Sequence, residues 1–121
     1  MTSQRNRITL DAEEQRDLMR TVRTLQVASI NPDGSPHLVP MWFSLDDEGL
    51  IVFSTYGASQ KARNLERDPR ITVLLETGDT YNELRGLSID GTAEFVRDPA
   101  SKRVKIRVHP RRIRSWDHRK I

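Results

Sequence analysis

The chain has 121 residues, 36% hydrophobic and 31% charged, which supports one soluble domain over residues 1–121 with a core of modest size. No apolar run reaches the ~20 residues that cross a bilayer, and Met1–Arg7 lacks the apolar segment of a signal peptide, so we expect a cytoplasmic protein. The chain has no cysteine, which excludes a disulfide scaffold, a zinc ribbon and thiol catalysis. The net charge of +3 hides an asymmetry, since residues 1–101 carry 11 Lys and Arg against 16 Asp and Glu, whereas residues 102–121 carry nine against one.

The first half of the chain predicts a helix followed by a β-hairpin. Leu10 to Val22 has apolar residues close to one face and acidic residues in the first turn, where the helix dipole favours them. Thr24–Ile30 and Ser35–Leu45 are typical of strands. Asn31–Gly34 between them is a turn, because proline presets one backbone angle and glycine tolerates positive φ.

The second half predicts four more strands and a short helix. Leu50–Thr55 follows the acidic turn Asp46–Gly49 as the third strand. A helix then begins after Ser59 and ends at Asp68, since the residue before a proline is pushed out of the helical region. The other strands are expected at Ile71–Glu76, Leu84–Val96 and Val104–Val108, with bulges or tight curvature at Gly86 and Gly91 and an end at Pro110.

Six strands joined by short turns, with a helix in front and one in the middle, predict a mainly β fold. Closure is the usual way in which an antiparallel sheet of this kind removes its edges. We therefore expect a closed or nearly closed, six-stranded antiparallel barrel with short flanking helices.

The turn between the third strand and its helix is rich in polar chemistry. Three hydroxyls and two basic side chains gather there: Ser54, Thr55, Ser59, Lys61 and Arg63. Acidic residues are usual in the first turn of a helix, so cations beside its free N–H groups predict a phosphate pocket. A solvated helix start is the alternative. The spacing matches neither a P-loop nor the dinucleotide fingerprint.

Four segments, in this order, resemble the split β-barrel flavin-binding proteins of the pyridoxamine 5′-phosphate oxidase-like superfamily. Val27–Phe43 resembles the opening hairpin, Gly57–Arg70 the phosphate-binding turn and helix, and Leu84–Glu94 the fifth strand. Arg114–Lys120 looks like the C-terminal signature of the actinobacterial branch that uses the deazaflavin coenzyme F420.

The resemblance implies a homodimer with the cofactor at the interface. It implies an F420-dependent oxidoreductase that transfers a hydride between the reduced deazaflavin and a small conjugated acceptor, without a membrane partner. Because the ring carries the chemistry, no protein nucleophile is needed, which fits the lack of cysteine and of a Ser-His-Asp pattern. No residue is identified as catalytic, and solvent or an interface residue would donate any proton.

Carried over residue by residue, the resemblance implies three groups of cofactor-binding residues. The ring would lie beside Pro40, Met41, Trp42 and Phe43, each of which could instead be core. The phosphate would be held by Ser54, Thr55, Ser59 and Lys61, with Gln60 and Asn64 either touching the cofactor or capping the turn. Trp116 and Arg119 would reach the cofactor of the neighbouring subunit, or Trp116 would pack at the interface.

The sequence departs from the family in one place. Members usually carry a helical segment between the fifth and the last strand, whereas Asp98–Ala100 here runs almost directly into Ser101. That segment helps to cover the pocket and the dimer surface in the family, so its absence leaves the acceptor open. His37, His109 and His118 show no metal-ligand spacing, so no metal site is expected.

Three other functions stay open at this point. FMN in place of F420 would indicate a pyridoxamine 5′-phosphate oxidase-like or flavin reductase-like protein. A non-catalytic barrel that binds a cofactor or heme would show tight binding without turnover. Nucleic-acid binding by the basic C-terminal end ranks last, because residues 102–121 alternate apolar and basic side chains like an ordinary strand.

Overall fold

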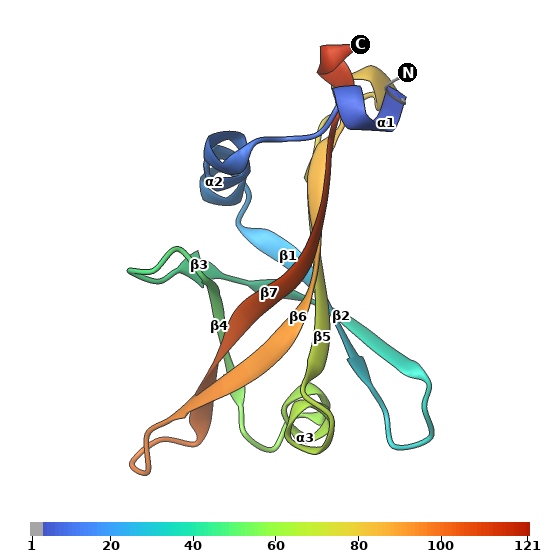
Figure 1. Ribbon diagram of the computed structural model, residues 1–121. Helices are drawn as coiled ribbons and strands as arrows, with labels where there is room; N and C mark the ends of the chain where they lie inside the picture. Colours follow the sequence, from blue (N-terminus) through green and yellow to red (C-terminus); the bar gives the residue numbers. More distant parts are fainter. Residues whose placement is uncertain (1–3) are drawn as a thin grey trace.

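The computed structural model describes residues 4–121 as one antiparallel sheet with short helices at its ends (Figure 1). Residues 1–3, part of the stretch compared above with a signal peptide, lie outside the described residues. The strands are β1 (Thr24–Ile30), β2 (Pro36–Trp42), β3 (Ser44–Leu45), β4 (Ile51–Tyr56), β5 (Arg70–Thr77), β6 (Arg85–Arg97) and β7 (Arg103–Asp117). The helices are α1 (Gln4–Arg7), α2 (Ala12–Thr21), α3 (Gln60–Arg67) and the 3-10 turns η1 (Tyr81–Glu83) and η2 (His118–Lys120). None of these helices is both long enough and apolar enough to span a bilayer.

The sheet has seven strands in the order β2-β1-β5-β6-β7-β4-β3, one more than the sequence predicts. The extra strand arises because the stretch predicted as one strand over Ser35–Leu45 divides at Phe43. Before Phe43 the chain pairs with β1, and after it Ser44 and Leu45 pair with β4 at the opposite edge of the sheet. One continuous segment therefore joins the two edges of the sheet.

The prediction that Pro110 ends the last strand was wrong, because β7 continues to Asp117. Gly91 pairs with Pro110 and Asp90 pairs with Arg112, so Arg111 is an extra residue in a β-bulge. A bulge tolerates proline, which has no N–H to give to the ladder. The bulge expected at Gly91 is confirmed, and a Cβ at this glycine would lie 2.5 Å from the His109 carbonyl oxygen.

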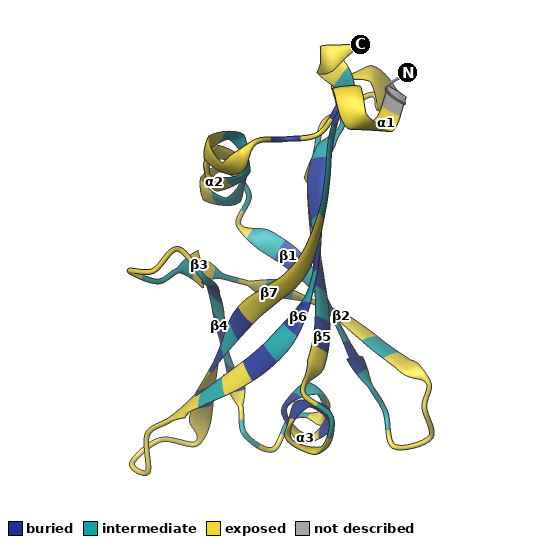
Figure 2. Ribbon diagram, in the orientation of Figure 1, coloured by how far each residue is buried: buried dark blue, intermediate teal, exposed yellow. Residues whose placement is uncertain are grey.

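The core fills the barrel with alternate residues of its strands (Figure 2). The β1 strand shows the pattern clearly, since Leu25, Val27 and Ser29 are buried and their neighbours are only partly so. The predicted N-terminal helix is confirmed as α2, where Asp11 and Glu14 form a capping box. Its Leu18 is fully buried and holds the helix on the barrel.

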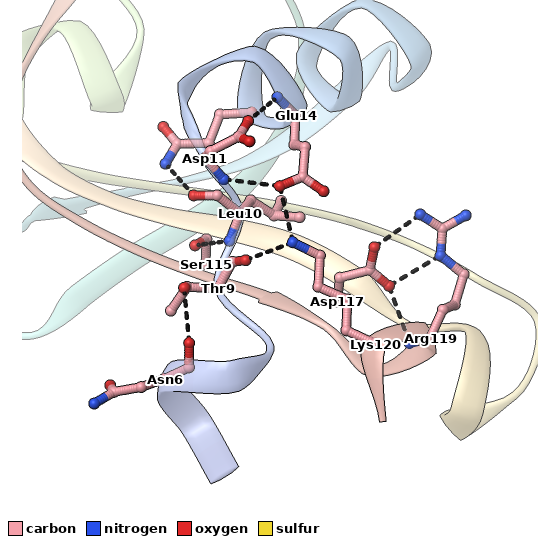
Figure 3. Close-up of polar contacts among 10 residues, drawn as sticks. Asn6, Thr9, Leu10, Asp11, Glu14, Ser115, Asp117, Arg119 and Lys120 are labelled. Atoms are coloured by element: carbon pink, nitrogen blue, oxygen red, sulfur yellow. Dashed lines mark hydrogen bonds and ion pairs between the residues drawn. The ribbon is translucent and has the colours of Figure 1, made fainter. Parts of the chain in front are cut away.

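The C-terminal end of β7 and η2 bind the N-terminal segment through a set of contacts that we call the terminal clamp (Figure 3). The Leu10 amide donates to Ser115 Oγ at 2.8 Å. Lys120 Nζ donates to both the Thr9 carbonyl and Glu14 Oε1, each at 2.8 Å. The segment predicted as a C-terminal signature thus holds α2 in place.

Three of the nine basic side chains of residues 102–121 form ion pairs with acidic residues earlier in the chain. The ion pairs that show this are Arg107–Asp46, Arg107–Glu94, Arg114–Asp90 and Lys120–Glu14. The charge asymmetry of the sequence is therefore compensated only in part within the folded chain.

Candidate functional site

The turn from β4 into α3 has the local structure that the sequence predicts. Ser59 is the N-cap of α3, and its Oγ accepts a hydrogen bond from the Ala62 amide at 3.2 Å. The first two amides of an α-helix, here those of Gln60 and Lys61, have no partner within the helix. No acidic residue occupies the first turn, so the positive end of the helix has no counter-charge of its own.

A hydroxyl–ammonium cluster lies against this helix start. Lys61 Nζ donates to Thr55 Oγ1 at 3.1 Å, and Thr55 Oγ1 lies 3.2 Å from Ser59 Oγ. Thr55 is buried, whereas Ser59 and Lys61 are partly exposed. The cluster can therefore offer an ammonium group, a hydroxyl and helix amides to an anion at its open side.

Ser54 and Thr55 are neighbours in a strand, so their side chains point to opposite faces of the sheet. The outward Ser54 Oγ accepts from Arg103 Nε, and the Ser54 carbonyl accepts from Arg103 Nη2, both at 3.0 Å. The Arg103 guanidinium also lies over the Tyr56 ring, 4.6 Å from its centroid. Of the four predicted phosphate ligands, the structure thus groups Thr55, Ser59 and Lys61 and holds Ser54 through Arg103.

Burial and the nearby Arg103 guanidinium lower the pKa of Lys61. Both causes disfavour the charged ammonium, and among the described residues no carboxylate pairs with it. A bound anion would remove this penalty. The chemistry of the donor set therefore fits a phosphate group.

Arg103 is the functional residue that sequence reasoning missed. It lies on the outer face with Ser54 and Tyr56, because β7 pairs with β4 and Arg103 is opposite Tyr56, and its charge lowers the pKa of Lys61. The two residues are far apart in the sequence, and the alternation that predicts the last strand does not give its pairing partner. Only the strand register could have identified it.

Asn64 has a structural position. Its side chain is fully buried, and its Nδ2 donates to Ser29 Oγ at 3.1 Å and to Asn31 Oδ1 at 3.0 Å. Gln60 Nε2 donates to Asn64 Oδ1 at 2.8 Å, and Arg67 donates to the Ile30 carbonyl. These bonds join α3 to the β1–β2 hairpin, so the geometry favours a positioning role for Asn64 over contact with a cofactor.

The predicted ring-contact segment lies on β2 and its junction with β3. Met41 and Phe43 point inward and pack against the core, whereas Pro40 and Trp42 lie on the outer face. Trp42 is 81% exposed and Leu38, on the same face, is 65% exposed. The alternation of the strand therefore divides the four residues between core and surface.

Trp116 lies at the C-terminal end of β7 and Arg119 in η2, and Figure 1 shows this part of the chain near the two termini and away from α3. Trp116 Nε1 donates to Glu76 Oε2 at 2.8 Å. Arg119 donates to both carboxylate oxygens of Asp117, at 2.9 and 2.8 Å, which lowers the pKa of that buried carboxyl. Within a single chain, Trp116 and Arg119 therefore do not lie at the α3 cluster.

Among the described residues, no group of three or more His, Cys, Asp or Glu side chains is placed to bind a metal ion.

Comparison with known proteins gives consistent matches. The family described as Pyridoxamine 5′-phosphate oxidase matches residues 11–119. A 5a,11a-dehydrotetracycline/5a,11a-dehydrooxytetracycline reductase of Streptomyces rimosus is 30% identical over 102 residues, covering 75% of this chain and 72% of that protein.

Solved structures share the fold. A conserved hypothetical protein of Mycobacterium tuberculosis has a TM-score of 0.91 at 41% identity, covering 98% of this chain and 92% of that chain. A structure described as an F420 reductase has a TM-score of 0.70 at 23% identity, covering 85% of this chain and 98% of that chain.

Proposed function

The chain belongs to the pyridoxamine 5′-phosphate oxidase family, and from that premise we propose that it is an F420-dependent oxidoreductase. It transfers a hydride between the reduced deazaflavin and a small conjugated acceptor. The observation that carries the proposal is the cationic cluster of Lys61, Thr55 and Ser59 at the start of α3, which has no acidic partner of its own.

The cofactor's phosphate would be held by Lys61, Ser59 and the first amides of α3, with Arg103 adding a second cation. Its ring would lie beside the backbone of Pro40–Phe43, where Met41 and Phe43 supply apolar contacts. When bound, the ring supplies the hydride chemistry, and the residues of this chain bind and orient it and exclude water.

The choice of F420 over FMN is supported by the resemblance of Arg114–Lys120 to the F420-using branch. The relative from Streptomyces rimosus is named as a reductase of dehydrotetracyclines, which supports reduction of an unsaturated small molecule. We place the protein in the cytoplasm.

A homodimer is part of the proposal. Leu38 and Trp42 expose large apolar side chains on one face of β2, and such a contiguous patch is typical of an interface. A second copy on that face would cover them, and the Trp116 and Arg119 of each chain could then approach the neighbour's cofactor.

The test is a side-by-side fluorescence titration of the purified protein with F420 and with FMN. Saturable binding of F420 with weaker binding of FMN supports the proposal. The reverse preference assigns the protein to FMN. Binding of neither cofactor contradicts a cofactor-dependent oxidoreductase.

A further inference from the structure

A groove of about 600 Å³ lies between the second half of α2 and the turn that joins β3 to β4. We call it the α2–β3 groove, and its volume falls within the ~300–1,000 Å³ of small-molecule sites. It lies outside the α3 cluster, and no residue of that cluster lines it.

One wall of the α2–β3 groove is cationic. Arg16 and Arg20 are four residues apart on α2 and share one helix face, and Arg23, just after the helix, also lines the groove. Arg20 has a loose pair with Asp17 at 3.8 Å, and Arg16 and Arg23 form no side-chain ion pair or hydrogen bond within the described chain.

The opposite wall is acidic and consists of Asp46, Asp47 and Glu48. Arg107 of β7 pairs with Asp46 at 2.8 Å and with Glu48 at 3.3 Å, and within the described chain no ion pair crosses the groove to its arginines. The pKa of Asp46 is lowered by the Leu50 amide and by Arg107, which keeps this wall anionic at neutral pH.

The floor between the walls is apolar. Met19, Phe43 and Leu45 line it and pack against the barrel core. The Phe43 amide donates to the Arg23 carbonyl at 3.2 Å, which ties the cationic wall to the residue where β2 passes into β3. The groove therefore adjoins the segment proposed to contact the cofactor ring.

We infer that the α2–β3 groove binds a zwitterionic molecule with an apolar body, whose anionic group faces Arg16 and Arg23 and whose cationic group faces the β3–β4 turn. An apolar body alone would leave Arg16 and Arg23 on one wall and Asp47 on the other without partners in the described chain, and a ligand with one charge would pair with only one wall. The zwitterionic character of the ligand follows from the groove itself, and only its identification as the hydride acceptor rests on the proposed function.

The test uses L-tryptophan as a zwitterionic probe, with indole-3-propionate, tryptamine and N-acetyl-L-tryptophanamide as its anionic, cationic and neutral counterparts. Each is titrated into the cofactor-free protein and followed by amide chemical shifts. We expect L-tryptophan to bind about fivefold tighter than the neutral amide, with shifts at Met19 and Phe43.

The variant R16A/R20A should remove most of that advantage, while Arg111→Ala, an exposed arginine on the β7 bulge, should keep it. Equal affinity for all four probes, or shifts elsewhere in the protein, would overturn the inference. The two tests are independent, because the tryptophan titration uses protein without cofactor. If tryptophan does not bind, the F420 titration still tests the proposed function. If F420 does not bind, the tryptophan titration still tests the groove.

Discussion

Lys61 is a partly buried cation beside a second cation, Arg103, and has no carboxylate partner in the described chain. Its ammonium group therefore contributes little to the stability of the free protein. We predict that Lys61→Ala weakens binding of the phosphorylated cofactor by about 10- to 100-fold, the loss of one charge-assisted contact. The melting temperature should change little, because the substitution also removes the repulsion from Arg103.

The measurement is a fluorescence titration paired with thermal unfolding. Arg111→Ala, which removes the same charge far from α3, serves as the control and should bind like the wild type. Unchanged affinity in Lys61→Ala would remove the phosphate assignment.

Asp117 is a buried carboxylate whose pKa is lowered, first of all by the side chain of Arg119. A lowered folded-state pKa contributes stability above the unfolded value of about 3.9, and this stability is lost as the pH falls through the folded value. We predict that Asp117→Asn reduces the free energy of unfolding by about 2 kcal/mol near neutral pH. Urea unfolding should show this difference shrinking below about pH 4.

Asp79→Asn is the matched control, because Asp79 is an exposed aspartate in the loop after β5. A difference between Asp117→Asn and the wild type that does not change with pH would contradict the role assigned to the Arg119 pair.

At the scale of residues, the sequence predicts what is local. Ser59 as N-cap and the position of Lys61 beside the helix start follow from a few neighbouring residues. Arg103 and the buried position of Asn64 could not be predicted, because each depends on contacts with strands distant in the sequence.

Among the strands, β6 is the element most constrained by its neighbours. A Cβ at Gly91 would meet the His109 carbonyl oxygen at 2.5 Å, inside a bulge of the β6–β7 ladder. We predict that Gly91→Ala lowers the free energy of unfolding by about 1–3 kcal/mol, since backbone must move to admit the methyl group. Chemical denaturation measures the change.

Gly57→Ala is a good control, because a Cβ there would have only ordinary contacts at 3.6 Å. It should alter the free energy of unfolding by less than about 0.5 kcal/mol. A similar, small effect at both glycines would contradict the close approach described at Gly91.

At the scale of elements, strand and helix types are predicted well, and their lengths less well. Periodicity identifies α2, α3 and the strands. It misses the division at Phe43, because Ser44 and Leu45 remain strand-like and only their partner changes. It ends β7 too early, because a proline at a bulge has the same local signal as a proline at a strand end.

For the whole molecule, the exposed face of β2 is the surface that we propose to form the dimer. We predict that Trp42→Arg shifts the protein from dimer to monomer, because a charge would replace a ring that is 81% exposed in the single chain. Sedimentation velocity measures the shift. Val96→Arg, at a less exposed apolar residue far from β2, should leave the dimer intact. A wild-type protein that sediments as a monomer would contradict the proposed dimer.

The overall barrel was predictable because its short turns and alternating strands leave few other topologies. The family resemblance supplied the order of its parts, and the match over residues 11–119 agrees with it. The α2–β3 groove was not predictable, since its charged walls come from α2 and the β3–β4 turn, which meet only through the folded chain.

The short pairing between β3 and β4 also has a consequence for the motion of the protein. Only two residue pairs, Ser44 with Val52 and Leu45 with Ile51, join β3 to β4, whereas the long ladder of β5, β6 and β7 is continuous. Short ladders open at a free energy far below that of global unfolding. We therefore expect the β3–β4 ladder to open locally while the rest of the sheet stays folded. Because Ser44 and Leu45 of β3 line the α2–β3 groove, this opening would let a ligand enter and leave.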